Sequence, residues 1–148
     1  MSTLPISLEH LFPSGELSHL ESSWRSLLVH GVSCDSRALL PGEVFFAMPG
    51  ERVDGRLYIG DARARGASAV IVPGEQFSAQ IVDGAPHIEA PRIRYHYARA
   101  ASIAAGSPAS QMVGIGVTGT NGKSSTTWIL SQALAMIEGT STNLGTLG

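Results

Sequence analysis

The residues with the clearest chemical role lie between Gly116 and Ser125, where the sequence reads GVTGTNGKSS. An apolar run at Val113–Val117 leads into this stretch, and a helix-forming run from Ser124 to about Ile137 continues it. A strand, a glycine-bearing loop and a helix in this order can hold phosphate, because glycine lets backbone amides approach the anion and the helix N-terminus adds a partial positive charge. The stretch therefore predicts a phosphate-binding loop.

Individual groups of this loop have distinct tasks. We expect the ammonium group of Lys123, the candidate catalytic residue, to reach the β- and γ-phosphates of ATP, and the hydroxyl of Ser124 to ligate Mg²⁺. The usual pattern, G-x-x-x-x-G-K-[ST], requires glycine where Val117 stands, so the loop belongs to a variant class. The alternative is that Gly119 and Gly122 only shape a turn between strand and helix. The predicted ATP-binding residues are Thr118, Gly119, Thr120, Asn121, Gly122, Lys123, Ser124 and Ser125.

The elements that precede the loop indicate a small α/β domain. Apolar runs and turn signals predict strands at 27–32, 44–48, 69–72 and 87–89, and helices at 55–65 and 92–105. Strands that are interspersed with helices are typical of this fold class. The first 26 residues contribute the expected core side chains Leu8, Leu11, Phe12, Leu17, Leu20 and Trp24.

A stretch of small residues, Gly106–Ser110, reads as a linker. It divides the chain into an expected domain at 1–106 and a second part at 107–148. In the second part, strands at 113–117 and 140–143 and the helix between them, which Gly139 closes, are expected to form the first βαβ unit of a nucleotide-binding domain. Trp128 on this helix is expected to face the sheet or a neighbouring helix.

The composition restricts the function classes. Hydrophobic residues form 43% of the 148-residue chain, enough for a packed core, and the net charge of −2 comes without a basic stripe, which argues against nucleic acid. No stretch approaches the roughly 20 apolar residues that span a bilayer, and the N-terminus lacks a signal-peptide pattern, so no membrane insertion is expected. Cys34 is the only cysteine, which excludes an internal disulfide and fits a cytoplasmic protein.

Other polar residues are expected to be structural. The five histidines lack metal-ligand spacing. Asp54-Gly55 is expected to cap a helix rather than to take part in catalysis. The residues between Arg92 and Arg99 combine arginine and tyrosine, which we interpret as the polar face of a solvated helix.

Three regions carry a family resemblance. Residues 119–125 (GTNGKSS) match the G-T-N-G-K-[ST]-[ST] loop of the Mur ligase family, which this chain resembles. Asp35-Ser36-Arg37 with residues 41–47 (PGEVFFA), and then Asp54-Gly55, resemble the N-terminal domain of the same family. Residues 145–148 (GTLG) are similar to the MurE-type branch, whereas MurF-type chains tend to carry an Asn-Asn pair at that place.

The resemblance implies an ATP- and Mg²⁺-dependent ligase of peptidoglycan synthesis. A MurE-type enzyme adds the third amino acid, meso-diaminopimelate or L-lysine, to UDP-N-acetylmuramoyl-L-alanyl-D-glutamate through an acyl phosphate. Its first domain is implied to bind the UDP part, with Ser36 as the foremost contact and Arg52 as a phosphate partner. Arg37 is either a further contact or a brace against Asp35 or Glu43. The implied UDP-site residues are Cys34, Ser36, Glu51, Arg52 and Val53.

Three other functions stay open at this point. Only 25 residues follow Lys123 (148 − 123), whereas a nucleotide-binding domain needs on the order of 100 or more. We therefore expect the chain to be part of a longer enzyme and to be inactive in ligation alone. The alternatives are a MurF-type ligase that adds D-alanyl-D-alanine, a non-catalytic UDP-sugar-binding module, and a generic P-loop kinase or GTPase.

Overall fold

The computed structural model describes residues 5–18, 20–50 and 53–145. The chain forms two compact units, Met1–Gln111 and Met112–Gly148. The first unit ends with η3 (Pro108–Gln111), a short 3-10 helix that includes part of the stretch predicted as a linker. The division into units therefore follows a segment without strands or long helices.

A five-stranded sheet, in the order β3-β4-β5-β7-β6, forms the centre of the first unit. Its strands are β3 (Gly31–Ser33), β4 (Glu43–Phe46), β5 (Ala69–Pro73), β7 (Ala85–Ala90) and β6 (Ser78–Val82). β3, β4, β5 and β7 are parallel to one another, so their carboxyl ends reach the same edge of the sheet. β6 pairs with β7 antiparallel and closes one side. The predicted mixed α/β class is confirmed.

Strand β6 is the strand of this sheet that the sequence analysis does not predict. As an edge strand it carries half-buried and exposed residues instead of a continuous apolar run. The β6–β7 hairpin turns at Asp83 and Gly84, whose φ angles are 51° and 76°. Positive φ at both central residues defines a tight hairpin turn for which Asp-Gly is a favoured sequence. The Asp83-Gly84 dipeptide is therefore the feature of the sequence from which this hairpin could have been predicted.

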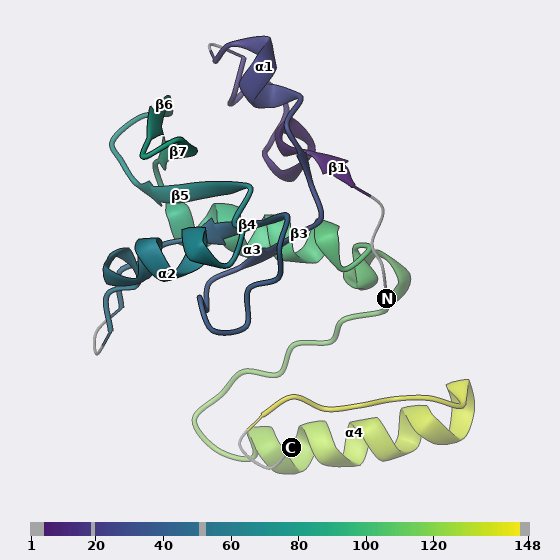
Figure 1. The fold of residues 1–148 in the computed structure, drawn as a ribbon. Helices are drawn as coiled ribbons and strands as arrows, with labels where there is room; N and C mark the ends of the chain where they lie inside the picture. Colours follow the sequence, from purple (N-terminus) through teal and green to yellow (C-terminus); the bar gives the residue numbers. More distant parts are fainter. Residues whose placement is uncertain (1–4, 19, 51–52, 146–148) are drawn as a thin grey trace. The chain divides into compact units, whose positions relative to one another are not determined.

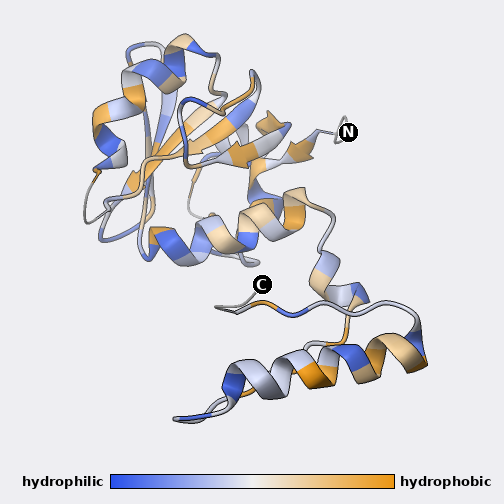
Figure 2. Cartoon of the chain, turned by 90° about the horizontal axis from the view of Figure 1, so that it is seen from below, coloured by the Kyte–Doolittle hydropathy of each residue, from blue (hydrophilic) through white to orange (hydrophobic). Residues whose placement is uncertain are grey.

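The central strands are buried on both faces, which explains their continuous apolar sequences. Side chains alternate along a strand, so Val44 and Phe46 enter one core cluster while Phe45 enters the other. Figure 2 shows the apolar strands between helices. In β5, Ile71 lies in the first cluster and Val70 in the second. Two separate cores therefore hold the sheet.

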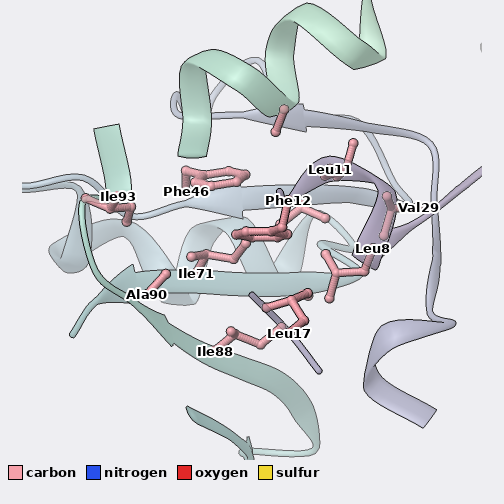
Figure 3. Close-up of a cluster of buried hydrophobic side chains, with 13 residues drawn as sticks. Leu8, Leu11, Phe12, Leu17, Val29, Phe46, Ile71, Ile88, Ala90 and Ile93 are labelled. Carbon is pink, nitrogen blue, oxygen red and sulfur yellow. The ribbon is translucent and has the colours of Figure 1, made fainter. Parts of the chain in front are cut away.

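The first face is covered by α3 (Ile93–Ala104) and by the N-terminal segment. That segment contains β1 (Ile6–Ser7), η1 (Leu8–Leu11), α1 (Ser22–Arg25) and β2 (Leu28–Val29). Figure 3 shows its apolar side chains beside Phe46, Ile71 and Ile88 of the sheet. Four predicted core residues, Leu8, Leu11, Phe12 and Leu17, are buried, whereas Leu20 and Trp24 are only half-buried.

The second face is covered by η2 (Gly55–Tyr58) and α2 (Ile59–Ala64), together the helix predicted at 55–65. Asp54 is the N-cap, and its Oδ1 accepts a hydrogen bond from the Arg56 amide (3.0 Å), which confirms the predicted capping role. Ala62 packs in the second cluster beside Phe45. The chain leaves the helix through Gly66, whose φ of 86° favours glycine.

The second unit contains α4 (Lys123–Glu138), with Gly122 as N-cap and Gly139 as C-cap. The helix predicted from about Ser124 to Ile137 is confirmed. The strands predicted at 113–117 and 140–143 are wrong: both segments lack strand structure, and Val113 is 91% exposed. A strand is stable only beside a hydrogen-bonding neighbour, and the described part of this unit offers none. Trp128 is 55% exposed, so its predicted burial is also wrong.

Candidate functional site

A cavity of about 420 Å³ opens at the edge of the sheet that the carboxyl ends of the parallel strands reach. Three parts of the chain line it: the loop after β3, the segment from the end of β4 to η2, and the start of α3, which follows β7. Ligands of α/β sheets bind outside the carboxyl ends of the strands, and this volume suits a small molecule. The cavity is therefore the candidate binding site of the first unit.

The loop after β3 is held by its own polar side chains. The Ser33 hydroxyl donates to the Asp35 carbonyl oxygen (3.0 Å). The Arg37 guanidinium binds Asp35 with two hydrogen bonds, Nε to Oδ1 (2.9 Å) and Nη2 to Oδ2 (2.7 Å). These bonds lower the pKa of the Asp35 carboxyl to about 2, so the carboxylate stays charged at neutral pH. Of the two predicted partners for Arg37, the structure selects Asp35, while Glu43 accepts from the Leu40 amide (2.9 Å).

The loop held by the Arg37–Asp35 pair contains two predicted substrate residues that line the cavity. Ser36 is buried, with 5% of its surface exposed, and Cys34 is exposed; both line the cavity. Behind them Tyr97 of α3 packs its ring against Phe46, with the centroids 5.3 Å apart. Burial, with a smaller effect of the neighbouring Cys34 thiol, raises the pKa of Tyr97 to about 12, so its hydroxyl stays protonated.

The described residues of the loop after β4 also line the cavity and are held by backbone hydrogen bonds. Pro49 and Asp54 make an isolated antiparallel bridge, and the Gly55 amide donates to the Met48 carbonyl oxygen (2.9 Å). A Cβ atom on Gly55 would meet that oxygen at 2.8 Å, closer than side chains tolerate. Val53, a predicted substrate contact, also lines the cavity. The predicted residues Glu51 and Arg52 lie outside the described residues.

Arg94 is a cavity residue that the sequence analysis missed. It is the second residue of α3, and its Nη2 donates to the Pro49 carbonyl oxygen (2.6 Å). We interpreted its region as a solvated helix face, because arginine and tyrosine alternate there without a motif. Only the position just after a predicted strand at 87–89, where α/β folds bind ligands, could have marked Arg94. Apolar lining comes from Phe45, Met48 and Tyr58.

The predicted phosphate loop lies in the second unit as an exposed, irregular turn before α4. Gly119 and Gly122 have φ angles of 149° and 77°. The Lys123 ammonium group donates to the carbonyl oxygens of Gly119 (2.5 Å) and Thr120 (3.4 Å), and thus folds back over the loop. The backbone amide of Thr126 donates to the Gly122 carbonyl oxygen (2.9 Å) at the start of the helix. In general, the first turn of a helix can bind an anion, because its backbone amides have no acceptor within the helix.

All predicted ATP-binding residues lie in the loop before α4 or in the first turn of this helix, because they are adjacent in the chain. Thr118, Thr120, Asn121 and Ser125 are exposed, and Ser124 is half-buried.

Within 5–18, 20–50 and 53–145, no group of three or more His, Cys, Asp or Glu residues is placed to hold a metal ion. In those same ranges no helix is long and apolar enough to cross a membrane.

Residues 28–106, more than half of the chain, match the Mur ligase family, catalytic domain. The chain belongs to the Mur ligase family. It is 38% identical over 98% of its length to the UDP-N-acetylmuramoyl-L-alanyl-D-glutamate–2,6-diaminopimelate ligase of Pseudomonas aeruginosa, and 36% identical over 97% to the ligase of the same name from Xanthomonas oryzae. This Mur ligase chain spans 28% of the length of each of these relatives.

Solved structures agree with the fold of this Mur ligase chain. A 2,6-diaminopimelate ligase matches 91% of the chain and 26% of its own length, with a TM-score of 0.65 at 22% identity. A MurF ligase from Thermotoga maritima, solved in complex with ADP, matches 72% of the chain and 23% of its own length, with a TM-score of 0.50 at 26% identity. The first likeness, at this identity, concerns the fold alone.

Proposed function

We propose that this chain carries the UDP-substrate pocket and the ATP-phosphate loop of a MurE-type ligase of peptidoglycan synthesis. The observation that carries the proposal is the 38% identity, over nearly the whole chain, to a 2,6-diaminopimelate ligase. The cavity at the sheet edge and the Lys123 loop give that likeness a physical basis. Relatives of this name favour diaminopimelate over L-lysine as the amino acid, and UDP-N-acetylmuramoyl-L-alanyl-D-glutamate as the acceptor.

In the proposed reaction, the γ-phosphoryl group of ATP is transferred to the D-glutamyl carboxylate. The amine of the incoming amino acid then attacks the acyl phosphate, forms the amide bond and releases inorganic phosphate. A carboxylate is a poor electrophile, and phosphorylation supplies the leaving group. The contribution of this chain is to position both substrates and to neutralise phosphate charge with Lys123, because phosphoryl transfer depends mainly on positioning and electrostatics.

We assign the substrate contacts to the residues already predicted. Cys34, Ser36 and Val53 line the cavity and are proposed to contact the UDP part. Residues 118–125 are proposed to hold the ATP phosphates. The hydroxyl of Ser124 fits Mg²⁺ as one ligand among phosphate oxygens and water, which is how this ion is usually held, and Mg²⁺ would supply neutralisation of phosphate charge.

A calorimetric titration of the 148-residue chain tests the proposal. We expect UDP and ATP–Mg²⁺ to bind independently, and we expect no ligation by this chain alone, since it spans 28% of its relatives. Binding of UDP without ATP would favour a non-catalytic UDP-sugar module. Binding of ATP without UDP would favour a generic P-loop protein, and binding of neither would refute the assignment.

A second experiment uses a property of the sequence. Lys123 is the only lysine in the chain, so an amine-reactive reagent modifies only Lys123 and the N-terminal amine. ATP–Mg²⁺ is expected to slow modification of Lys123 severalfold and to leave the N-terminus unaffected, as read by peptide mass spectrometry. Equal protection of both amines, or of neither, would argue against a phosphate contact of Lys123.

A further inference from the structure

Among the described residues that line the cavity, three have a charged side chain: Asp35, Arg37 and Arg94. The first two neutralise each other through their paired hydrogen bonds of 2.9 Å and 2.7 Å. The pairing also keeps the Arg37 guanidinium on the loop after β3, and 86% of the Arg37 side chain is exposed to solvent. Among the described residues of the lining, Arg94 is therefore the charged residue without an opposite charge paired to it.

Arg94 has donors to spare. A guanidinium offers five N–H donors, and in the described parts of the chain Arg94 uses one, Nη2, for the Pro49 carbonyl oxygen (2.6 Å). No carboxylate pairs with Arg94 within those parts, whereas Arg92, two residues earlier, meets Glu16 at 3.3 Å. The neighbouring arginine is therefore already neutralised, and Arg94 remains able to bind an anion with several hydrogen bonds.

The rest of the lining explains which kind of anion fits. Phe45 is 1% exposed and, with Met48 and Tyr58, gives the cavity an apolar surface beside the cationic group. The buried Ser36 adds a hydroxyl for orientation. A ligand with a flat, weakly polar part and a strongly charged part matches this division, as a nucleoside diphosphate does.

We propose that Arg94 binds the diphosphate of the nucleotide substrate and, through Pro49, couples that contact to the loop after β4. The inference rests on the proposed function, because it assumes that the cavity takes a nucleoside diphosphate. It goes beyond that function by assigning the phosphate contact to the first turn of α3, a segment that carries no recognisable motif. Charge-assisted hydrogen bonds from arginine to phosphate are among the strongest polar contacts in proteins.

The test compares UDP with uridine, which lacks the diphosphate. Both ligands are titrated into the 148-residue chain and followed by protein NMR, which measures dissociation constants into the millimolar range. Arg94→Gln is expected to weaken UDP binding roughly 10- to 100-fold, the loss of a charged hydrogen-bonding group, and to change uridine binding by less than about twofold. Arg94→Lys keeps the charge without the planar fork and is expected to lie between the two.

A control variant and an unfolding measurement separate the possible outcomes. Arg99→Gln removes an exposed charge from the same helix, outside the cavity, and is expected to leave both affinities unchanged. If Arg94→Gln weakens UDP and uridine equally, Arg94 only holds the Pro49 loop, and the phosphate assignment is wrong. If wild-type protein binds neither ligand, the proposed function itself fails. Thermal unfolding of each variant identifies loss of fold, and Arg94→Lys then carries the comparison.

Discussion

The two units place their candidate sites in opposite ways. In the first unit, the cavity gathers Ser36, Val53 and Arg94 from three segments that the parallel sheet brings to one edge. In the second unit, the predicted phosphate loop is a run of consecutive residues at the start of α4. A site made of neighbours in the chain is visible as a motif, whereas a site assembled by a sheet depends on the packing of the whole unit.

The burial of apolar side chains also differs between the two units. Phe46 and Ile71 are completely buried between the sheet and its covering helix, whereas Ile129 and Ile137 of α4 are 62% and 77% exposed. Burial of an apolar side chain contributes about 1.5–3 kcal/mol. The first unit therefore has a core of its own, and the site of the second unit depends on local helix structure.

The largest expected effect concerns the core of the first unit. Ile71→Ala removes buried methyl groups from the central strand and is expected to destabilise this unit by about 2–5 kcal/mol, with loss of UDP binding. The matched control, Ile137→Ala, changes a side chain that is 77% exposed and is expected to stay within about 0.5 kcal/mol. Urea denaturation followed by circular dichroism measures both. Equal effects would contradict the contrast between the units.

The next effect concerns the folded loop of the cavity. Gly55→Ala would place a Cβ atom 2.8 Å from the Met48 carbonyl oxygen, so the backbone has to move, at a cost of about 1–3 kcal/mol. The control is Gly60→Ala in α2, where nothing lies within 4 Å and alanine favours the helix by about 0.5–1 kcal/mol. Thermal unfolding and UDP titration of both variants measure whether the packing of this loop affects stability and UDP binding together.

A smaller effect on stability, but a specific one on binding, is expected in the second unit. Lys123→Ala removes an exposed ammonium group whose hydrogen bonds, among the described residues, go to loop carbonyls, so we expect little change in unfolding. ATP–Mg²⁺ binding is expected to weaken about 10-fold or more, from the loss of a charged contact, while UDP binding stays the same. Calorimetry with both ligands measures this. A parallel loss of UDP affinity would mean that the two sites are not independent.

The smallest effect is a pH dependence of the first unit. His96 is fully buried among Phe12, Phe77 and Tyr95, and burial lowers the pKa of its imidazole in spite of Glu16, whose Oε2 lies 3.4 Å from Nε2. Arg92 and Arg99 also disfavour its charged form. The unfolded state then binds more protons below about pH 6.5, the ordinary histidine value, so stability falls as the pH decreases below this value.

The variant His96→Phe is expected to make this decrease shallower. His87, whose pKa is also lowered, by burial and then by Arg63, contributes the remaining slope. Urea denaturation between about pH 5 and 7.5, which brackets the ordinary histidine pKa, measures the effect in the wild type and the variant, with His10→Gln as an exposed control. An unchanged slope in His96→Phe would contradict the role of the buried imidazole.

How far the sequence predicts the fold is clear from particular elements. β5 and α4 follow from continuous apolar runs and glycine caps, since local patterns specify them. The strands expected at 113–117 and 140–143 fail because an apolar run becomes a strand only beside a partner. β6 is missed for the converse reason: a hairpin turn and a neighbour form it, without a strong apolar pattern.

The sequence by itself predicted the phosphate loop, and it determined the helix that follows this loop and the family, because these depend on residues adjacent in the chain. The family resemblance also implied substrate contacts at Ser36, within the Asp35-Ser36-Arg37 match, and at Val53, in the loop after Gly50. Only the tertiary structure decided that Arg37 pairs with Asp35 and that Arg94 reaches the same cavity from a distant helix. The physical reason is that a parallel sheet aligns the ends of strands far apart in sequence, and no local pattern records which side chains meet there.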